Sequence, residues 1–158
     1  MIRIISKTEK ETKAAGMRLA RLLKPGQTVY LFGELGSGKT VFVKGMAPAL
    51  GVPEEDVTSA SFTIIAEHEG TNGRPFYHVD LYRLEDAGDI HETGIDEYPG
   101  PDGIAVIEWA ERLFLPFSPR PAGGVMVRIN VTRGGPVSRQ GPREIIIEGV
   151  DEEDWHHS

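Results

Sequence analysis

The chain has 158 residues, contains no cysteine and carries a formal net charge of -7 at pH 7. This length suits one domain, and the lack of cysteine excludes a disulfide scaffold, a thiolate nucleophile and a cysteine-ligated zinc site. The acidic balance disfavours nucleic-acid binding by bulk electrostatics. No apolar run approaches the roughly 20 residues of a membrane span, and the N-terminus has no signal-peptide pattern, so we expect a cytoplasmic domain with no membrane association.

The first elements predicted along the chain are a short strand and an amphipathic helix. An isoleucine-rich start predicts the strand over residues 2–5. Thr8 and Glu11 have the capping-box spacing that starts a helix. The apolar residues that share one face of this helix are Ala15, Leu19, Leu22 and Leu23. Pro25-Gly26 is expected to end it.

A glycine-rich loop follows the second predicted strand, which is the apolar run 28–32. Residues 33–40 read G-E-L-G-S-G-K-T and match the pattern G-x-x-x-x-G-K-[ST]. In this pattern the glycines let backbone N–H groups turn toward phosphate oxygens, and the next helix, expected over 39–50, adds its positive N-terminal end. Lys39 can reach the β- and γ-phosphates, and the Thr40 hydroxyl can bind Mg²⁺. A chance match is the alternative in a glycine-rich chain, but the strand before the loop and the helix after it favour nucleotide binding.

A hairpin and two short helical pieces are predicted next. Two strand-like runs, 62–67 and 76–82, flank Asn72-Gly73, a dipeptide typical of a hairpin turn. The acidic stretch 85–98 fits two short helical pieces. Further strands are expected at 104–107, 125–131 and 145–147.

The order of these elements predicts the fold class. Helices between strands in the first half indicate a parallel α/β sheet, whereas the hairpin and the last two strands add antiparallel neighbours. We therefore expect an α/β fold, a three-layer P-loop NTPase with a mixed, mostly parallel sheet and added antiparallel strands. A single P-loop domain would span residues 1–150. The Gly- and Pro-rich segment 133–142 is expected to form a mobile loop, and the acidic tail 151–158 a frayed or disordered end.

Two carboxylates follow predicted buried strands, where a P-loop protein needs an acid for its metal. Asp80 follows residues 77–79, and Glu108 follows residues 104–107. Each could hold Mg²⁺ or its water, or position an attacking water. The alternative for either residue alone is an ordinary carboxylate at a strand end. Because a P-loop requires at least one such acid, we expect one or both to serve.

Other features leave two interpretations open. The hydroxyl-rich stretch 57–63 is either a switch loop that senses the γ-phosphate or a polar lead-in to the next strand. His78 fits a packed strand residue better than a metal ligand, and Trp109 fits a core residue better than a platform for a base. A solvated strand face is favoured over an anion-binding or partner surface for Arg128, Arg133, Arg139 and Arg143. The sequence has no N-K-x-D motif for guanine, which disfavours a Ras-like GTPase.

Four motifs, in this order, resemble the TsaE (YjeE) family, the P-loop ATPases of bacterial tRNA threonylcarbamoyladenosine synthesis. They are G-E-L-G-S-G-K-T at Gly33–Thr40, the S-P-T-F-like stretch Ser59–Phe62, H-V-D-L-Y-R-L at His78–Leu84, and I-E-W at Ile107–Trp109. The resemblance extends from Ser6 to Glu148. This chain has Ala60-Ser61 where the family usually has Pro-Thr, so the hydroxyl is kept while the backbone loses the stiffness of proline.

The resemblance implies a role for each matching residue. The phosphates of ATP would be bound by Gly36, Ser37, Gly38, Lys39 and Thr40. Mg²⁺ would be held by Thr40, Asp80 and Glu108, and the catalytic residues would be Lys39, Asp80 and Glu108. Further contacts with the nucleotide or the switch would come from Thr8, Ser61, Trp109 and Arg143.

The resemblance also implies partner proteins. Similar proteins bind a TsaD–TsaB complex, and their ATP hydrolysis is thought to reset that complex between turnovers on tRNA, so contact with tRNA would be indirect. The acidic net charge fits a protein that acts through protein partners. One alternative is a P-loop kinase for a small molecule or a protein, which would need an acceptor pocket and a cationic lid. Another is a module that binds ATP without turnover. From the residues alone, an ATPase is favoured over a kinase.

Overall fold

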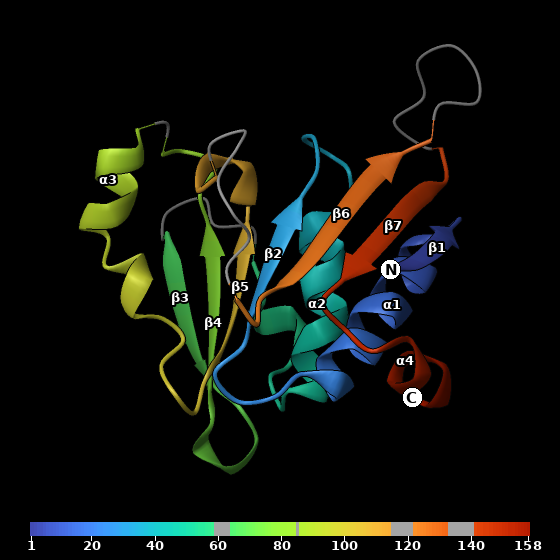
Figure 1. Ribbon diagram of the computed structural model, residues 1–158, viewed down its shortest axis with the longest axis horizontal. Helices are drawn as coiled ribbons and strands as arrows, with labels where there is room; N and C mark the ends of the chain where they lie inside the picture. Colours follow the sequence, from blue (N-terminus) through green and yellow to red (C-terminus); the bar gives the residue numbers. More distant parts are fainter. Residues whose placement is uncertain (59–63, 85, 115–121, 133–140) are drawn as a thin grey trace.

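The structure is a computed structural model that describes residues 1–58, 64–84, 86–114, 122–132 and 141–158 (Figure 1). The predicted residues Ser61 and Phe62, and almost all of the predicted loop 133–142, lie outside the described residues. The strands are β1 (Ile2–Ser6), β2 (Thr28–Phe32), β3 (Ile65–Glu69), β4 (Pro75–Asp80), β5 (Ile104–Glu108), β6 (Val125–Val131) and β7 (Arg143–Glu148). The α-helices are α1 (Glu9–Leu22), α2 (Lys39–Ala49), α3 (Ala87–Glu92) and α4 (Glu152–His157). Short 3₁₀ turns are η1 (Glu54–Asp56), η2 (Thr71–Gly73), η3 (Ile95–Glu97) and η4 (Ala110–Arg112).

Within the described ranges, seven strands form one sheet in the order β1-β7-β6-β2-β5-β4-β3. β2 pairs in parallel with β5 and with β6, and β4 pairs in parallel with β5. The pairs β1–β7, β6–β7 and β3–β4 are antiparallel. The mixed α/β sheet is therefore confirmed. Antiparallel pairings are as frequent as parallel ones in this part of the chain, so "mostly parallel" holds for the four central strands rather than for the whole sheet.

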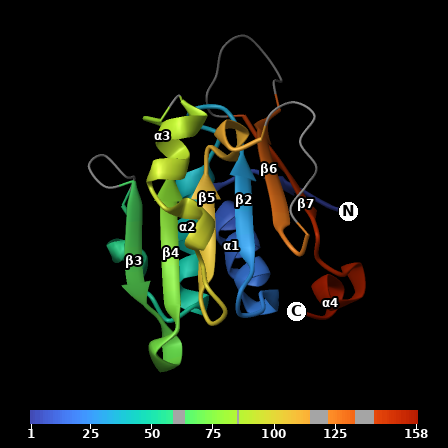
Figure 2. The ribbon, with the colours of Figure 1, turned by 60° about the vertical axis from the view of Figure 1, so that its left-hand side comes forward.

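Helices cover both faces of the sheet (Figure 2). α1 and α2 pack on one face, where Val29 and Leu31 of β2 join the larger apolar core. Tyr30, between them, points to the opposite face and packs against a smaller core that includes Ile90 of α3. This alternation follows from the two-residue period of a strand. Because both faces of β2 are covered, this strand is apolar from Val29 to Phe32.

α1 and α2 approach each other so closely that two positions must be glycine. A Cβ at Gly16 would lie 2.2 Å from the carbonyl oxygen of Phe42, and one at Gly45 would lie 2.1 Å from that of Lys13. Real Cβ atoms essentially never come this near to backbone atoms. The two glycines therefore fix the distance between the helices, and so the position of α2 against the sheet.

The local signals in the sequence place the ends of several elements. The Thr8 hydroxyl accepts a hydrogen bond from the Glu11 amide at 3.1 Å, as the capping box predicts. In the hairpin, Asn72 and Gly73 both have positive φ, of 59° and 72°, which suits their residue types. β3 begins at Ile65, and the predicted start of this strand at residue 62 lies outside the described residues. Among the described helices, none is both long and apolar enough to cross a membrane.

The prediction of a frayed C-terminal tail is wrong for this structure. Residues 152–157 form the short helix α4, which Asp151 caps by accepting a hydrogen bond from the Glu153 amide. Trp155 is only 4% exposed and belongs to the larger apolar core. The Arg18 guanidinium of α1 lies 4.6 Å from the centre of the Trp155 ring. Burial of one large aromatic side chain thus holds a segment whose acidic composition alone suggests disorder.

Candidate functional site

The glycine-rich loop connects the end of β2 to the start of α2. Gly36 and Gly38 have φ of 78° and 108°, conformations that L side chains rarely adopt. α2 begins at Lys39, with Gly38 as its N-cap. The first N–H groups of a helix have no acceptor within the helix, so this end of α2 carries unpaired donors and a partial positive charge. The N-terminal end of α2 is therefore suited to binding an anion.

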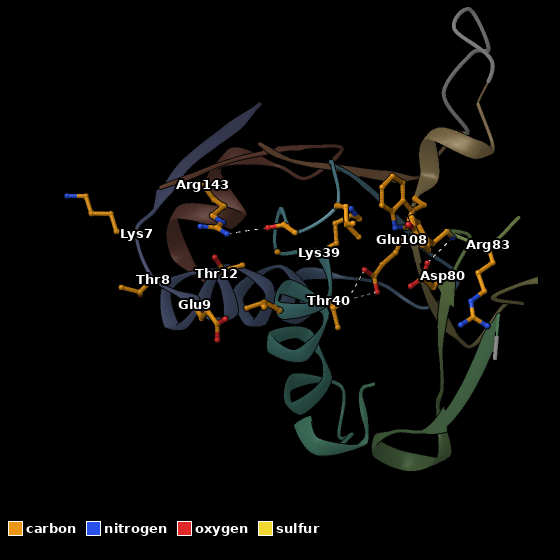
Figure 3. A pocket seen from close by; sticks show the side chains of 16 residues that line it. Lys7, Thr8, Glu9, Thr12, Lys39, Thr40, Asp80, Arg83, Glu108 and Arg143 are labelled. Atoms are coloured by element: carbon orange, nitrogen blue, oxygen red, sulfur yellow. Dashed lines mark hydrogen bonds between the residues drawn. The ribbon is translucent and has the colours of Figure 1, made fainter. Parts of the chain in front are cut away.

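A cavity of about 720 Å³ lies at this end of α2 (Figure 3). Its walls come from the β1–α1 junction, the glycine-rich loop, the ends of β4 and β5, and the start of β7. In Figure 3, Thr40, Glu108 and Asp80 lie on one side of the cavity, whereas Thr8, Thr12 and Arg143 lie on the other. The volume is in the range of small-molecule sites in proteins.

Lys39 is nearly buried, with 5% of its surface exposed, although it lines this cavity. Its Nζ donates hydrogen bonds to the carbonyl oxygens of Gly33 at 2.5 Å and of Glu34 at 3.0 Å. Burial lowers the pKa of Lys39, and the negative charge of nearby carboxylates, that of Glu111 above all, opposes this shift. The ammonium is therefore fixed by the loop that it belongs to and lies in an acidic surrounding.

Glu108 is the buried carboxylate of the site, with 2% of its surface exposed. The Thr40 hydroxyl donates to its Oε1 at 3.0 Å, and His78 Nε2 lies 2.5 Å from its Oε2. The Thr40 hydroxyl also lies 3.3 Å from Oε2, so the start of α2 contacts both carboxylate oxygens and β4 contacts one of them. A buried carboxylate needs such partners, because an unpaired one is costly.

Asp80 lies next to Glu108 because the β4–β5 register pairs the two residues. Its Oδ1 accepts a hydrogen bond from the Tyr82 amide at 2.9 Å. Burial raises the pKa of Asp80, the Tyr82 amide opposes this, and the charge of Glu108 adds to the increase. Two neighbouring carboxylates with little solvent are unfavourable on their own, and a bound cation would relieve that cost.

The donors at this point fit Mg²⁺. A hydroxyl and two carboxylates are oxygen ligands, which Mg²⁺ prefers. Over the described ranges, no group of three or more His, Asp and Glu side chains is placed to hold a metal ion by itself. Mg²⁺ commonly binds through one or two carboxylates together with waters and substrate phosphates. The residues therefore suit a cation that arrives with a phosphorylated ligand better than one held by protein alone.

Arg143 contacts the glycine-rich loop from the start of β7. Its Nε and Nη2 donate to the carbonyl oxygens of Ser37 and Gly36, each at 3.2 Å, and its Nη1 donates to that of Gly141 at 2.6 Å. These bonds fix the orientation of two peptide groups in the loop. Ser37 Oγ is buried and, among the described residues, has no hydrogen-bond partner.

A family profile described as "Threonylcarbamoyl adenosine biosynthesis protein TsaE" matches residues 6–139 of this sequence. This chain belongs to the TsaE family. Its role, as for the family, is in the biosynthesis of threonylcarbamoyladenosine in tRNA.

Individual TsaE proteins agree with this assignment. The tRNA threonylcarbamoyladenosine biosynthesis protein TsaE of Treponema pallidum is 41% identical over 112 residues, which cover 71% of this chain and 81% of that protein. The protein of the same name from Nostoc sp. is 36% identical over 147 residues, covering 89% and 83%. Among solved structures, the crystal structure of Bacillus subtilis YdiB superimposes with a TM-score of 0.71 at 31% identity, covering 99% of this chain and 95% of that one.

Most residues predicted for the TsaE site line the cavity described above. They are Thr8, Gly36, Gly38, Lys39, Thr40, Asp80, Glu108, Trp109 and Arg143. Ser37 lies in the loop but its side chain is turned into the protein, and Ser61 lies outside the described residues. His78 is a packed strand residue, as predicted. Trp109 is only partly buried, so it belongs both to the edge of the smaller core and to the cavity wall.

The sequence did not identify several cavity residues of this TsaE protein. Tyr82 and Arg83 line it and belong to the H-V-D-L-Y-R-L motif, which is the signal that could have found them. Lys7 and Thr12 line it from the β1–α1 junction, and no motif marks them. Glu111 accepts a hydrogen bond from the Gly33 amide at 2.7 Å, a contact between segments 78 residues apart.

Proposed function

We propose that this TsaE protein binds ATP with Mg²⁺ and hydrolyses it slowly, in support of threonylcarbamoyladenosine synthesis on tRNA by a TsaD–TsaB complex. The observation that carries the proposal is the grouping of Lys39, Thr40, Glu108 and Asp80 at one side of a cavity that a helix N-terminus enters. Positive charge for phosphates and oxygen ligands for a cation are thereby combined at one place.

The loop and α2 would bind the phosphates. Unpaired amides at the start of α2 donate to phosphate oxygens, and Lys39 adds a point charge that can reach the β- and γ-phosphates. Because Lys39 Nζ is already bonded to Gly33 and Glu34, it loses little side-chain freedom when a phosphate binds. Arg143 would assist by keeping the loop in shape.

Thr40, Asp80 and Glu108 would hold Mg²⁺, which when bound supplies neutralisation of charge on the phosphates. Glu108 has a second task in this proposal. Its carboxylate is held by the Thr40 hydroxyl and by His78, so it can orient a water molecule for attack on the γ-phosphate. Removal of the Glu108 carboxylate should therefore reduce hydrolysis more than it reduces nucleotide binding.

The proposed partners are TsaD and TsaB, with tRNA reached only through their complex. The net charge of -7 supports action through proteins rather than through a broad contact with tRNA. Slow hydrolysis by the isolated protein would agree with a cycle in which the partner complex completes or triggers the reaction.

The test is phosphate release from Mg-ATP by the purified protein, alone and with TsaD–TsaB added. Lys39→Ala and Glu108→Ala serve as controls. We expect release that the partner pair stimulates and that both variants lose. Tight ATP binding without release in either condition would contradict the ATPase, and a screen for labelled phosphoryl acceptors would then test the kinase alternative.

A further inference from the structure

Trp109, directly after Glu108, has an unusual backbone conformation. Its φ of 60° and ψ of 42° lie in the left-handed region, which bulky residues rarely adopt. Such a conformation costs free energy and persists only where surrounding contacts fix it.

Among the described residues, the cation nearest to the indole is the ammonium of Lys39. Lys39 Nζ lies 4.0 Å from the ring centre, well within the range of a cation–π interaction. The Arg112 guanidinium is farther away, at 5.8 Å, and the Tyr82 ring packs on the indole with 5.1 Å between centres. Because Lys39 is nearly buried, its cation–π contact is poorly screened by water.

The indole ring covers one side of the Lys39 ammonium that the loop carbonyls leave uncovered. Two carbonyl oxygens, of Gly33 and Glu34, accept its hydrogen bonds, and the indole covers another side. A carboxylate in the place of the ring would neutralise the ammonium and compete with a phosphate for it. An aromatic face attracts the cation but leaves its charge available to an anion.

We propose that Trp109 is a positioning residue that holds the Lys39 ammonium in place for the β- and γ-phosphates, by a cation–π contact rather than by contact with the nucleotide. The proposal rests on the proposed binding of ATP at this loop. This role explains the left-handed backbone at Trp109. The turn directly follows β5, which ends at Glu108, and it places the indole ring beside the Lys39 ammonium.

The first test observes the contact itself in the nucleotide-free protein. The ε-methylene protons of Lys39, seen in the NMR spectrum of ¹³C-lysine-labelled protein and assigned with Lys39→Met, should be shifted upfield by the indole ring. We expect this shift to vanish in Trp109→Leu and to persist in part in Trp109→Phe. A Lys39 signal without a ring shift in the unmodified protein would overturn the proposal.

The second test varies the ring's electrons and leaves its shape nearly unchanged. The chain has two tryptophans, so in a Trp155→Phe background fluorinated tryptophans enter only at Trp109. ATP affinity, measured by calorimetry, should fall step by step with the number of fluorines, toward the roughly 3- to 30-fold loss expected for Trp109→Leu. The matched control is Trp109→Phe, in which the same labels enter only at Trp155 and should change nothing further.

The outcomes separate this proposal from the proposed function. An ATP affinity that does not change with fluorination at Trp109 would refute the positioning role, even if ATP binds tightly. If the unmodified protein shows the ring shift but binds no Mg-ATP, the contact is real and the nucleotide site is wrong, so a role in positioning Lys39 for phosphate fails together with the proposed function. Ring shift and fluorine dependence together support the proposal.

Discussion

Substitution of Gly45 by alanine tests whether the close approach of α1 and α2 is needed for the fold. The added Cβ would lie 2.1 Å from the Lys13 carbonyl oxygen and 2.5 Å from the Lys13 Cα. Ordinary contact begins at 3.4 Å, so the helices would have to separate by about 1 Å. Both obstructing atoms belong to the backbone, so no side-chain rotation can relieve the clash.

The expected loss of stability follows from two opposing effects. Overpacking of this kind typically costs about 1–3 kcal/mol and occasionally more. Replacement of glycine by alanine inside a helix returns up to about 1 kcal/mol through helix propensity. Because the clash is with backbone, we expect the high end of the cost and a net destabilisation of about 2 kcal/mol. For a chain of this length that lowers Tm by roughly 4–8 °C.

The assay is thermal unfolding followed by circular dichroism. The matched control is Gly88→Ala in α3, another helical glycine, which is exposed. Among the described residues, its added Cβ would meet the Asp86 side chain alone, at 3.1 Å. We expect the Tm of this control to stay the same or rise slightly. If Gly45→Ala also left Tm unchanged or raised it, the argument that glycine sets the distance between the helices would be refuted.

Three further predictions concern the carboxylates and the C-terminal helix. Asp80→Asn should raise the Tm of the nucleotide-free protein while it abolishes the Mg²⁺ dependence of ATP binding. Burial raises the pKa of Asp80, so the folded state binds its proton more tightly than the unfolded state does, and the contribution of Asp80 to stability falls as pH rises through the unfolded and then the folded pKa. In urea unfolding across that pH range, the free energy of unfolding should change less with pH in Asp80→Asn than in the unmodified protein. An unchanged slope would contradict a raised pKa of Asp80. His78→Ala removes a partner of the buried Glu108 carboxylate and should cost about 3 kcal/mol, with His78→Gln recovering part of it; equal stabilities of the two variants would count against the hydrogen bond. Trp155→Ala should cost about 3 kcal/mol, and a Tm equal to that of the unmodified protein would mean that α4 adds nothing to the fold.

The sequence predicted the elements whose signals are local. The capping pair Thr8 and Glu11, the turn Asn72-Gly73 and the glycine-rich loop each place specific residue types within a few positions of each other, and each prediction agrees with the structure. The prediction of a frayed C-terminal tail was wrong because the contact that holds the tail is not local. Trp155 packs against α1, with Arg18 more than a hundred positions earlier, and no window of sequence records such a contact.

Contacts between distant segments explain what was missed in the site. Glu108 was predicted as an acid at the end of a strand, but its hydrogen bonds to Thr40 and His78 depend on the pairing of β5 with its neighbours. The left-handed turn at Trp109 has no sequence signal, because glycine or asparagine is the residue usually expected there. The chemical type of each side chain in the site could therefore be predicted from the sequence, whereas the residues that it contacts could not.

Strand direction explains why these segments meet. β2, β5 and β4 are adjacent and parallel, so the glycine-rich loop, Glu108 and Asp80 all lie at the same edge of the sheet, where open α/β sheets bind their ligands. β7 runs antiparallel to β6, so its first residue, Arg143, starts at that edge. β1 runs antiparallel to β7, so its end delivers Thr8 to the same place. A reversal of any one strand would remove its residue from the cavity without changing the sequence motif to which the residue belongs. The motifs therefore specify which chemical groups are present, and the mixed topology of the sheet brings those groups together.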